Sequence, residues 1–234
     1  MKRELTNKIN YILDNLIPPI IRDNKMFMFP LFWLLFKDKA RYFLNFKENV
    51  AHMSKEEYCN CYAYLADVHL QRDTDLNAKC INFILNNIEG NKVLDIACGR
   101  GFLSKEIAQK DNALKVFGLD IIPPKEISGL HKNLAFMEGS VENIPFDDNF
   151  IDTTICAHTL EHTQNINKAI SELRRVTRNK LIIVVPKQRE YKYTFDLHLN
   201  FFPYEFCLLK VMNHKNGTIV TLDGDFIYYE SKQS

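Results

Sequence analysis

The sequence predicts an α/β protein with a doubly wound sheet of seven mostly parallel strands, an antiparallel C-terminal hairpin and an N-terminal helical cap. Three observations predict this fold. Short apolar segments alternate with helix-like segments after residue 92, which implies parallel strands joined by right-handed crossovers. Residues 1 to about 90 instead show apolar positions at helical spacing. Near the end, Asp223-Gly224 separates two alternating apolar segments, which indicates a hairpin.

The cap begins with a helix that is expected to end at Pro18-Pro19. The most apolar segment of the chain follows at 26–36 and contains Pro30. It is far shorter than the roughly 20 residues that span a bilayer, so we do not expect it to cross a membrane. We expect a helix that covers the core or a dimer partner, and a shallow contact with a membrane surface is the alternative.

Two more helices are predicted before the sheet. Residues 54–70 begin with Ser54 and have Glu57 three positions later, which is the spacing of a capping box. A further helix at 76–88 is expected to be capped by residue 74 or 75.

The sheet region is predicted to contain five parallel strands, three helices and the hairpin. The parallel strands are expected at 92–97, 115–120, 133–137, 151–157 and 180–185, the helices at 102–110, 165–177 and 203–213, and the hairpin strands at 218–222 and 225–229. The predicted domains are therefore a helical cap over 1–77 and a sheet domain over 78–234.

Composition excludes several classes of protein. With 17 Phe and 10 Tyr, most of the chain is too aromatic to be disordered. A net charge of +1 removes bulk charge as a reason to bind nucleic acid, and no nucleic-acid partner is expected. The 6 cysteines form no CxxC pair and have no zinc spacing, so free thiols in a reducing compartment are expected. Because no signal peptide is visible at the polar N-terminus, we expect a cytoplasmic protein.

The sharpest motif follows the first predicted strand. Residues 93–101 run from a buried strand into a turn with Gly99 and Gly101, where a ligand can approach the backbone closely. A dinucleotide fold would have a third glycine where Ser104 stands. Asp95 sits at the strand end instead, and its carboxylate would repel phosphate but suit a cationic amino-acid group. Asp120 ends the second strand, where a carboxylate accepts hydrogen bonds from ribose hydroxyls.

Together with the segments 137–146 and 150–162, these features resemble class I S-adenosylmethionine-dependent methyltransferases over about residues 78–234. The resemblance implies a Rossmann-like methyltransferase fold with S-adenosyl-L-methionine as the cofactor. It also implies that the amino-acid end, ribose, adenine and methyl group of the cofactor are held by residues after the first four strands: Asp95, Ala97, Cys98, Gly99, Gly101, Asp120, Ile121, Ser140, Val141, Ala157 and His158. Ser140 stands where the family commonly has Asp.

The acceptor is expected beyond the carboxyl ends of the strands. Candidate catalytic groups there are Glu161, His162 and His198, because removing a proton from a hydroxyl acceptor needs a base. A subset of the family, the small-RNA and ubiquinone-pathway O-methyltransferases, carries E-x-x-E-H after the fourth strand and binds a divalent metal. His158, Glu161, His162 and His198 are therefore a candidate metal site, and metal-free packing of the L-E-H segment is the alternative.

The long loop after Pro186 predicts a binding role and is rich in cations and aromatic rings. The candidate acceptor-binding residues are Arg72, Lys187, Arg189, Lys192 and Tyr193, and a cationic cluster suits an anionic small molecule. The preferred hypothesis is O-methylation of a small polar or anionic metabolite, such as a surface-glycan or capsule precursor. The alternatives are a quinone or lipid acceptor at a membrane surface, an inactive binding module and, less favoured, RNA. A monomer and a homodimer both fit the sequence.

Overall fold

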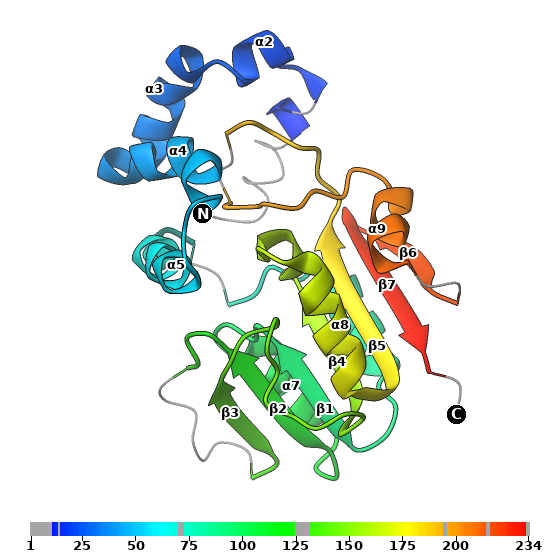
Figure 1. Cartoon of the computed structure of the whole chain (residues 1–234). Helices are drawn as coiled ribbons and strands as arrows, with labels where there is room; N and C mark the ends of the chain where they lie inside the picture. The colour runs from blue at the N-terminus through cyan, green and yellow to red at the C-terminus, as the bar shows by residue number, and fades with distance from the viewer. Residues whose placement is uncertain are drawn as a thin grey trace. The chain divides into compact units, whose positions relative to one another are not determined.

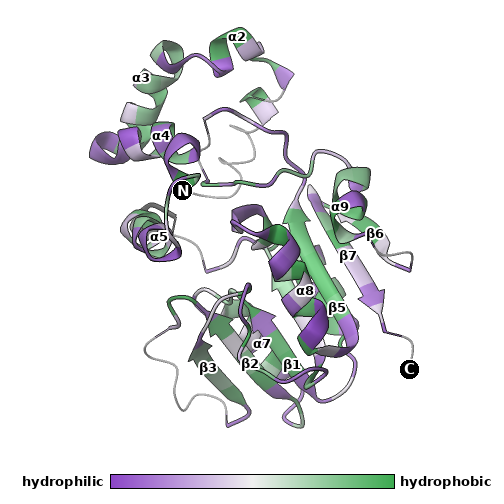
Figure 2. Ribbon diagram, viewed as in Figure 1, coloured by the Kyte–Doolittle hydropathy of each residue, from purple (hydrophilic) through white to green (hydrophobic). Residues whose placement is uncertain are grey.

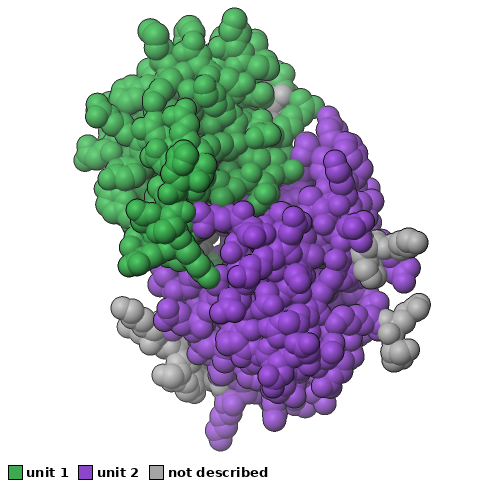
Figure 3. Space-filling model, in the orientation of Figure 1, with its two compact units in different colours: residues 1–73, 188–201 green, residues 74–187, 202–234 purple. Residues whose placement is uncertain are grey.

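The computed structural model describes residues 11–13, 15–69, 73–124, 132–193, 196–213 and 216–232, without the side chains of 66–69. The chain forms two compact units (Figure 3). Met1–Asp73 and Gln188–Phe201 form one, the helical unit, and Thr74–Lys187 and Phe202–Ser234 form the other, the sheet unit. Compared with the predicted boundary, residues 74–77 belong with the sheet and the segment 188–201 belongs with the N-terminal helices.

Up to residue 69, the described part of the helical unit contains short helices. The helices are α2 (Pro19–Arg22), α3 (Lys25–Phe36), the 3-10 turn η1 (Lys37–Lys39), α4 (Ala40–Val50) and α5 (Lys55–His69) (Figure 1). Pro19 stands in the first turn of α2, where its missing N–H costs nothing, so the proline pair also starts a helix. The predicted capping box is confirmed, because Glu57 N–H donates to Ser54 Oγ and Ser54 N–H donates to Glu57 Oε2.

Aromatic side chains hold the helical unit together. The rings of Phe36 and Phe43 stack with centroids 4.0 Å apart, and Phe32 and Phe46 are buried beside them. The segment 188–201 joins this unit because it contributes core residues to the same cluster, namely Tyr191, Tyr193 and Leu197. The loop that the sequence predicts as an acceptor loop is thus partly a core segment.

The sheet unit confirms the predicted fold. Its strands are β1 (Lys92–Ile96), β2 (Lys115–Asp120), β3 (Leu134–Glu138), β4 (Ile151–Ala157), β5 (Thr177–Pro186), β6 (Thr218–Leu222) and β7 (Asp225–Ser231), in the order β3-β2-β1-β4-β5-β7-β6. The first five are parallel, and β7 is antiparallel to both β5 and β6.

Helices pack on both faces of this sheet. They are α6 (Ala78–Asn86), α7 (Phe102–Lys110), α8 (Ile166–Val176) and α9 (Glu205–Met212). Alternate residues of β5 divide between two cores: Leu181 and Ile183 lie in the cluster that contains residues of α8 and α9, and Ile182 and Val184 lie in the one that contains residues of α6 and α7. Because β5 is covered on both faces, most of it is apolar (Figure 2).

Most element boundaries lie within two residues of the prediction, and two of the differences, at α6 and β5, have an identifiable cause. The cap of α6 is Asn77 and not residue 74 or 75, because the Asn77 side chain accepts a hydrogen bond from Cys80 N–H at 2.8 Å. β5 begins at Thr177, directly after α8, and its first residue pairs with Ile151. Among the described residues, no helix is both long and apolar enough to cross a membrane.

Candidate functional site

The predicted cofactor residues of the sheet unit gather at the carboxyl edge of four neighbouring strands. In the order β3-β2-β1-β4, these strands end at Glu138, Asp120, Ile96 and Ala157. The predicted residues lie close to these strand ends: Asp95, Ala97, Cys98, Gly99 and Gly101 at the end of β1, Asp120 and Ile121 at the end of β2, Ser140 and Val141 after β3, and Ala157 and His158 at the end of β4. In open parallel sheets this edge is where ligands bind.

The turn after β1 is tight because its backbone adopts left-handed angles. Ala97, Gly99 and Gly101 have φ values of 54°, 54° and 73°. The turn is closed by Gly101 N–H, which donates to the Cys98 carbonyl at 2.8 Å, and it is tied to β2 by Cys98 N–H, which donates to the Leu119 carbonyl at 3.2 Å.

The two glycines of this turn have different surroundings. A Cβ at Gly101 would lie 2.6 Å from Cε1 of Phe136, whereas a Cβ at Gly99 would meet nothing within 4 Å. Gly101 is therefore required by packing against β3, and Gly99 faces open space that a ligand can enter. The sequence analysis did not find Phe136, because no local signal marks an aromatic residue that packs under a distant turn.

Asp95 is buried beneath the turn and is bound by Ser104. Ser104 Oγ donates to Asp95 Oδ2 at 2.6 Å, so the residue in place of a third glycine orients the strand-end carboxylate. Burial raises the pKa of Asp95 to about 7, the Ser104 hydrogen bond opposes this, and the nearby charge of Asp120 adds to it. A cationic ligand group beside Asp95 would favour the ionised carboxylate.

Asp120 accepts one backbone N–H on each carboxylate oxygen. Gly99 N–H donates to Oδ2 at 2.8 Å and Ile122 N–H donates to Oδ1 at 2.9 Å. Burial raises the pKa of Asp120, and these backbone hydrogen bonds oppose the shift. A carboxylate has about four acceptor positions, so both oxygens retain capacity for hydroxyl donors.

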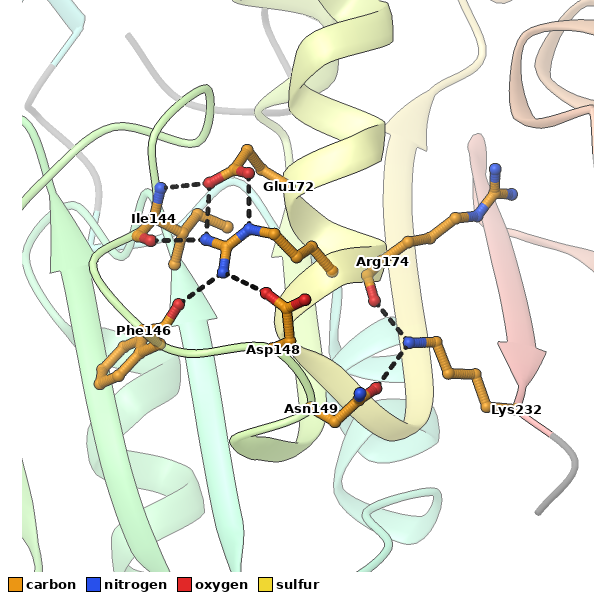
Figure 4. Close-up of polar contacts among 8 residues, drawn as sticks. Ile144, Phe146, Asp148, Asn149, Glu172, Arg174 and Lys232 are labelled. Carbon is orange, nitrogen blue, oxygen red and sulfur yellow. Dashed lines mark hydrogen bonds and ion pairs between the residues drawn. The ribbon is translucent and has the colours of Figure 1, made fainter.

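The segment after β3 is fastened to α8. Glu172, Asp148 and the carbonyls of Ile144 and Phe146 surround one guanidinium in Figure 4, that of Arg175. Glu172 Oε2 also accepts from Ile144 N–H at 2.9 Å. The hydrogen bond with Arg175 lowers the pKa of Glu172. This network holds the chain that directly follows Ser140 and Val141, and Ser140 Oγ itself accepts from Glu142 N–H at 3.3 Å.

The turn after β4 holds a largely buried histidine, with 15% of its side chain exposed, between two carboxylates. His158 has a φ of 48°, and its backbone N–H donates to the Val184 carbonyl at 2.9 Å. Nδ1 of His158 lies 3.3 Å from Glu161 Oε1, and Nε2 lies 3.6 Å from Asp225 Oδ2. Burial lowers the pKa of His158, but the carboxylates of Asp225 and Glu161 outweigh it and raise the pKa to about 10. At neutral pH His158 is therefore an imidazolium.

Asp225 was not found by sequence analysis, although it directly follows the Asp-Gly hairpin turn. It begins β7 and also accepts from Asn77 Nδ2 at 3.0 Å. The antiparallel addition of β7 beside β5 brings Asp225 to the end of β4, so its role depends on strand order.

Known proteins are similar to this chain in sequence. A family model described as a methyltransferase domain matches residues 94–185, which include the turn after β1, Asp120 and the end of β4. Over residues 94–185 the chain therefore matches a methyltransferase domain, in agreement with the resemblance seen in the sequence.

Two curated relatives show how far the similarity to this methyltransferase domain extends. The ubiquinone/menaquinone biosynthesis C-methyltransferase UbiE of Stutzerimonas stutzeri is 27% identical over 158 residues, which cover 60% of this chain and 56% of the relative. The malonyl-[acyl-carrier protein] O-methyltransferase of Buchnera aphidicola is 33% identical over 102 residues, which cover 42% of this chain and 40% of the relative. The chain thus spans about half the length of the curated relatives it matches.

A solved structure supports the fold of the methyltransferase domain. The Burkholderia thailandensis 1,6-didemethyltoxoflavin-N1-methyltransferase, with 1,6-didemethyltoxoflavin and S-adenosylhomocysteine bound, aligns with a TM-score of 0.58 and 17% identity. The alignment covers 76% of this chain and 87% of that one.

The remaining residues of the predicted site are divided between the two units. Glu161 is 1% exposed and lies with His162 in the 3-10 turn η2 (Leu160–His162) of the methyltransferase domain. Lys187 is exposed in the same unit, with its ammonium 5.9 Å from the ring centroid of Phe226. Burial raises the pKa of both Cys98 and Cys156, so these are neutral thiols.

In the helical unit, His198 is buried and bound by its own segment. Its Nδ1 lies 2.5 Å from Gln188 Oε1 and 3.4 Å from Asp196 Oδ2. A metal site that includes His198 stays a prediction, as does its role as a base. His158 faces a carboxylate with each ring nitrogen, so a metal would have to displace one of these contacts.

The predicted acceptor-binding residues of the helical unit differ in exposure. Arg189 and Lys192 are exposed, whereas Tyr193 is 4% exposed and belongs to the aromatic core. Lys192 and Tyr193 also line a hollow of about 480 Å³ within this unit, together with Asp23, Leu44, Lys47, Glu48, Glu190 and Tyr191. Arg72 lies outside the described residues.

Proposed function

We propose that this chain is an S-adenosylmethionine-dependent methyltransferase that methylates an oxygen of a small polar or anionic metabolite, such as a sugar or phosphoryl group of a surface-glycan precursor. The single observation that carries the cofactor assignment is Asp120, which ends β2 beside the glycine turn of β1 with unused acceptor capacity on both oxygens. The methyltransferase-domain match to residues 94–185 and the neighbour with bound S-adenosylhomocysteine support it.

Each residue of the edge has a defined part in this proposal. Asp120 accepts hydrogen bonds from the ribose hydroxyls, and Asp95 faces the cationic amino group. Ser140 and Val141 flank the adenine, and Ala157 and His158 lie below the methyl group. When bound, S-adenosylmethionine supplies an electrophilic methyl group on a sulfonium.

The protein must then orient the acceptor oxygen in line with that group and remove its proton. His158 is not the base, because its two neighbouring carboxylates keep it protonated. The candidate bases are His162, His198 and Glu161. A divalent metal on His158, Glu161, His162 and His198 would replace the base by lowering the pKa of the acceptor hydroxyl. The exposed cations Lys187, Arg189 and Lys192 support an anionic acceptor.

Calorimetry with S-adenosylmethionine tests the cofactor assignment. Asp120→Ala is expected to weaken binding about tenfold to hundredfold, since it removes hydrogen bonds to a charged acceptor. Asp111→Ala is the matched control, because Asp111 also accepts a backbone N–H, from Ala113 at 2.9 Å, but precedes β2 instead of ending it. Absence of binding by the wild-type protein would support the inactive-module alternative.

The mechanism has its own tests. His198→Ala is expected to lower turnover at least about tenfold with little change in cofactor affinity, as for loss of a base. Full activity in EDTA would contradict the proposal that a divalent metal takes part in catalysis. Transfer of labelled methyl groups to sugar phosphates, with uncharged sugars as the control, tests the acceptor class.

A quinone or lipid is the second candidate acceptor. The relative from Stutzerimonas stutzeri is named as a quinone-pathway methyltransferase, and α3 exposes large apolar side chains. Methyl transfer to a short-chain quinone, but not to sugar phosphates, would favour this candidate over the first.

A further inference from the structure

The helix α3 of the helical unit has two different apolar faces. Met28, Phe32 and Phe36 are buried in the aromatic core. On the opposite side, Met26, Trp33 and Leu34 are 84%, 52% and 65% exposed. Their spacing of seven and eight residues places them on one stripe of the helix. A helix that is apolar all round but covered on one side only leaves a surface that water solvates poorly.

Two further apolar residues nearby in the sequence are also exposed, and Phe27 shares the stripe because it lies seven residues before Leu34. Ile20 of α2 and Phe27 of α3 are 80% and 63% exposed. Scattered apolar residues are normal on protein surfaces, but five large ones within fifteen residues are not scattered. We call Ile20, Met26, Phe27, Trp33 and Leu34 the α3 face.

Cationic side chains flank the α3 face in the sequence. Lys25, Lys37 and Arg41 are exposed, and the Lys37 ammonium lies 5.0 Å from the ring centroid of Trp33. Over residues 19–41 the sequence has five cations, Arg22, Lys25, Lys37, Lys39 and Arg41, against Asp23 and Asp38. Tryptophan beside lysine is the combination that favours the boundary between lipid headgroups and acyl chains.

We propose that the α3 face docks this protein onto an anionic lipid surface. At 1.5 Å per residue, α3 is about 18 Å long, against about 30 Å for the hydrocarbon of a bilayer, so it would lie in the plane of the membrane. The apolar stripe enters the headgroup boundary, and Lys25, Lys37 and Arg41 bind lipid phosphates. The cationic border argues against a second copy as the occupant, because a twofold contact would bring the same cations toward each other.

Trp33 provides the test, because it is the only tryptophan of the sequence. The full chain is mixed with vesicles of phosphatidylcholine alone or with phosphatidylglycerol, and Trp33 emission and co-sedimentation are measured. We expect a blue shift and sedimentation with the anionic vesicles, both weakened by salt. Met26→Ser/Leu34→Ser keeps the probe and should lower the partition coefficient at least about tenfold. Lys37→Glu/Arg41→Glu should abolish the preference for anionic lipid.

Phe206→Ser is the matched control, since Phe206 of α9 is 63% exposed but belongs to the sheet unit and should leave binding unchanged. Far-ultraviolet circular dichroism shows whether each variant is folded. Equal binding by folded wild type and Met26→Ser/Leu34→Ser, or no binding by wild type, overturns the proposal. A dimer in sedimentation velocity that this double variant dissociates, without vesicle binding, would assign the face to a second copy. Calorimetry with S-adenosylmethionine is independent of all these outcomes, so the proposed function can fail or hold separately.

Discussion

The pH dependence of cofactor binding should identify Asp95 as the partner of a cation. In the free protein the pKa of Asp95 is about 7, chiefly because the carboxyl is buried. Since the ordinary pKa of an aspartate is 3.8, this shift disfavours the ionised form of Asp95 by about 4 kcal/mol. A cationic amino group would bind the ionised form, so below pH 7 binding must release a proton.

The size of the effect follows from the ionised fraction. With a pKa of about 7, about half of the Asp95 carboxyls are ionised at pH 7, against roughly 3% at pH 5.5. Affinity for S-adenosylmethionine should therefore fall roughly fifteenfold between these two pH values. Asp95→Asn cannot ionise, and its amide oxygen can still accept from Ser104, so its weaker affinity should change much less over this range.

Titration calorimetry in two buffers of different ionisation enthalpy measures both the affinity and the protons released. The wild type should release close to one proton per cofactor at the lower pH, and Asp95→Asn should release fewer. If both proteins show the same pH dependence and proton release, Asp95 does not pair with a cation and this assignment is wrong.

Three other predictions concern stability and are measured by urea unfolding. Gly101→Ala should lower the free energy of unfolding by about 1–3 kcal/mol, because its φ is 73° and the new Cβ would lie 2.6 Å from Phe136. Gly99→Ala, whose Cβ would meet nothing within 4 Å, should lose less stability but more cofactor affinity. Equal losses of stability would contradict the packing argument. Arg175→Met should lose about 1–2 kcal/mol, because it removes the guanidinium hydrogen bonds to Glu172 and to the carbonyls of Ile144 and Phe146, although Glu172 and the Ile144 carbonyl each keep a backbone N–H donor. Arg178→Met should lose under about 0.5 kcal/mol, because its side chain is 54% exposed. The free energy of unfolding should fall as the pH rises from about 6.5 to about 10, because the pKa of His158 is about 10 in the folded protein and about 6.5 in the unfolded chain. Below this window the imidazolium contributes its full stabilisation. His158→Gln should lack the fall, and an unchanged pH profile in this variant would show that His158 is not its source.

The sequence by itself determined most of the sheet, because its signals are local. An apolar strand covered on both faces, such as β5, appears as a continuous apolar segment at 181–185, and Asp223-Gly224 marks the β6–β7 hairpin directly. The turn after β1 is local too, since its glycines provide the backbone angles that a ligand-binding turn needs. Strand order in this fold class then carries Asp95 and Asp120 to the same edge.

Only the tertiary structure decided which charges meet. Asp225 reaches His158 because β7 pairs with β5. Phe136 lies under Gly101 because β3 pairs with β2, and β2 pairs with β1, the strand that leads into the glycine turn. The helix cap at Asn77 also depends on contacts between distant residues. Residues 74, 75 and 77 are all good caps by local sequence, but the Asn77 side chain also donates to the Leu222 carbonyl and to Asp225. Likewise, Tyr191 and Tyr193 read as loop residues in sequence, but the aromatic core of the helical unit buries them. Local sequence specifies backbone angles and apolar periodicity, whereas pairing energies between distant side chains depend on which elements become neighbours.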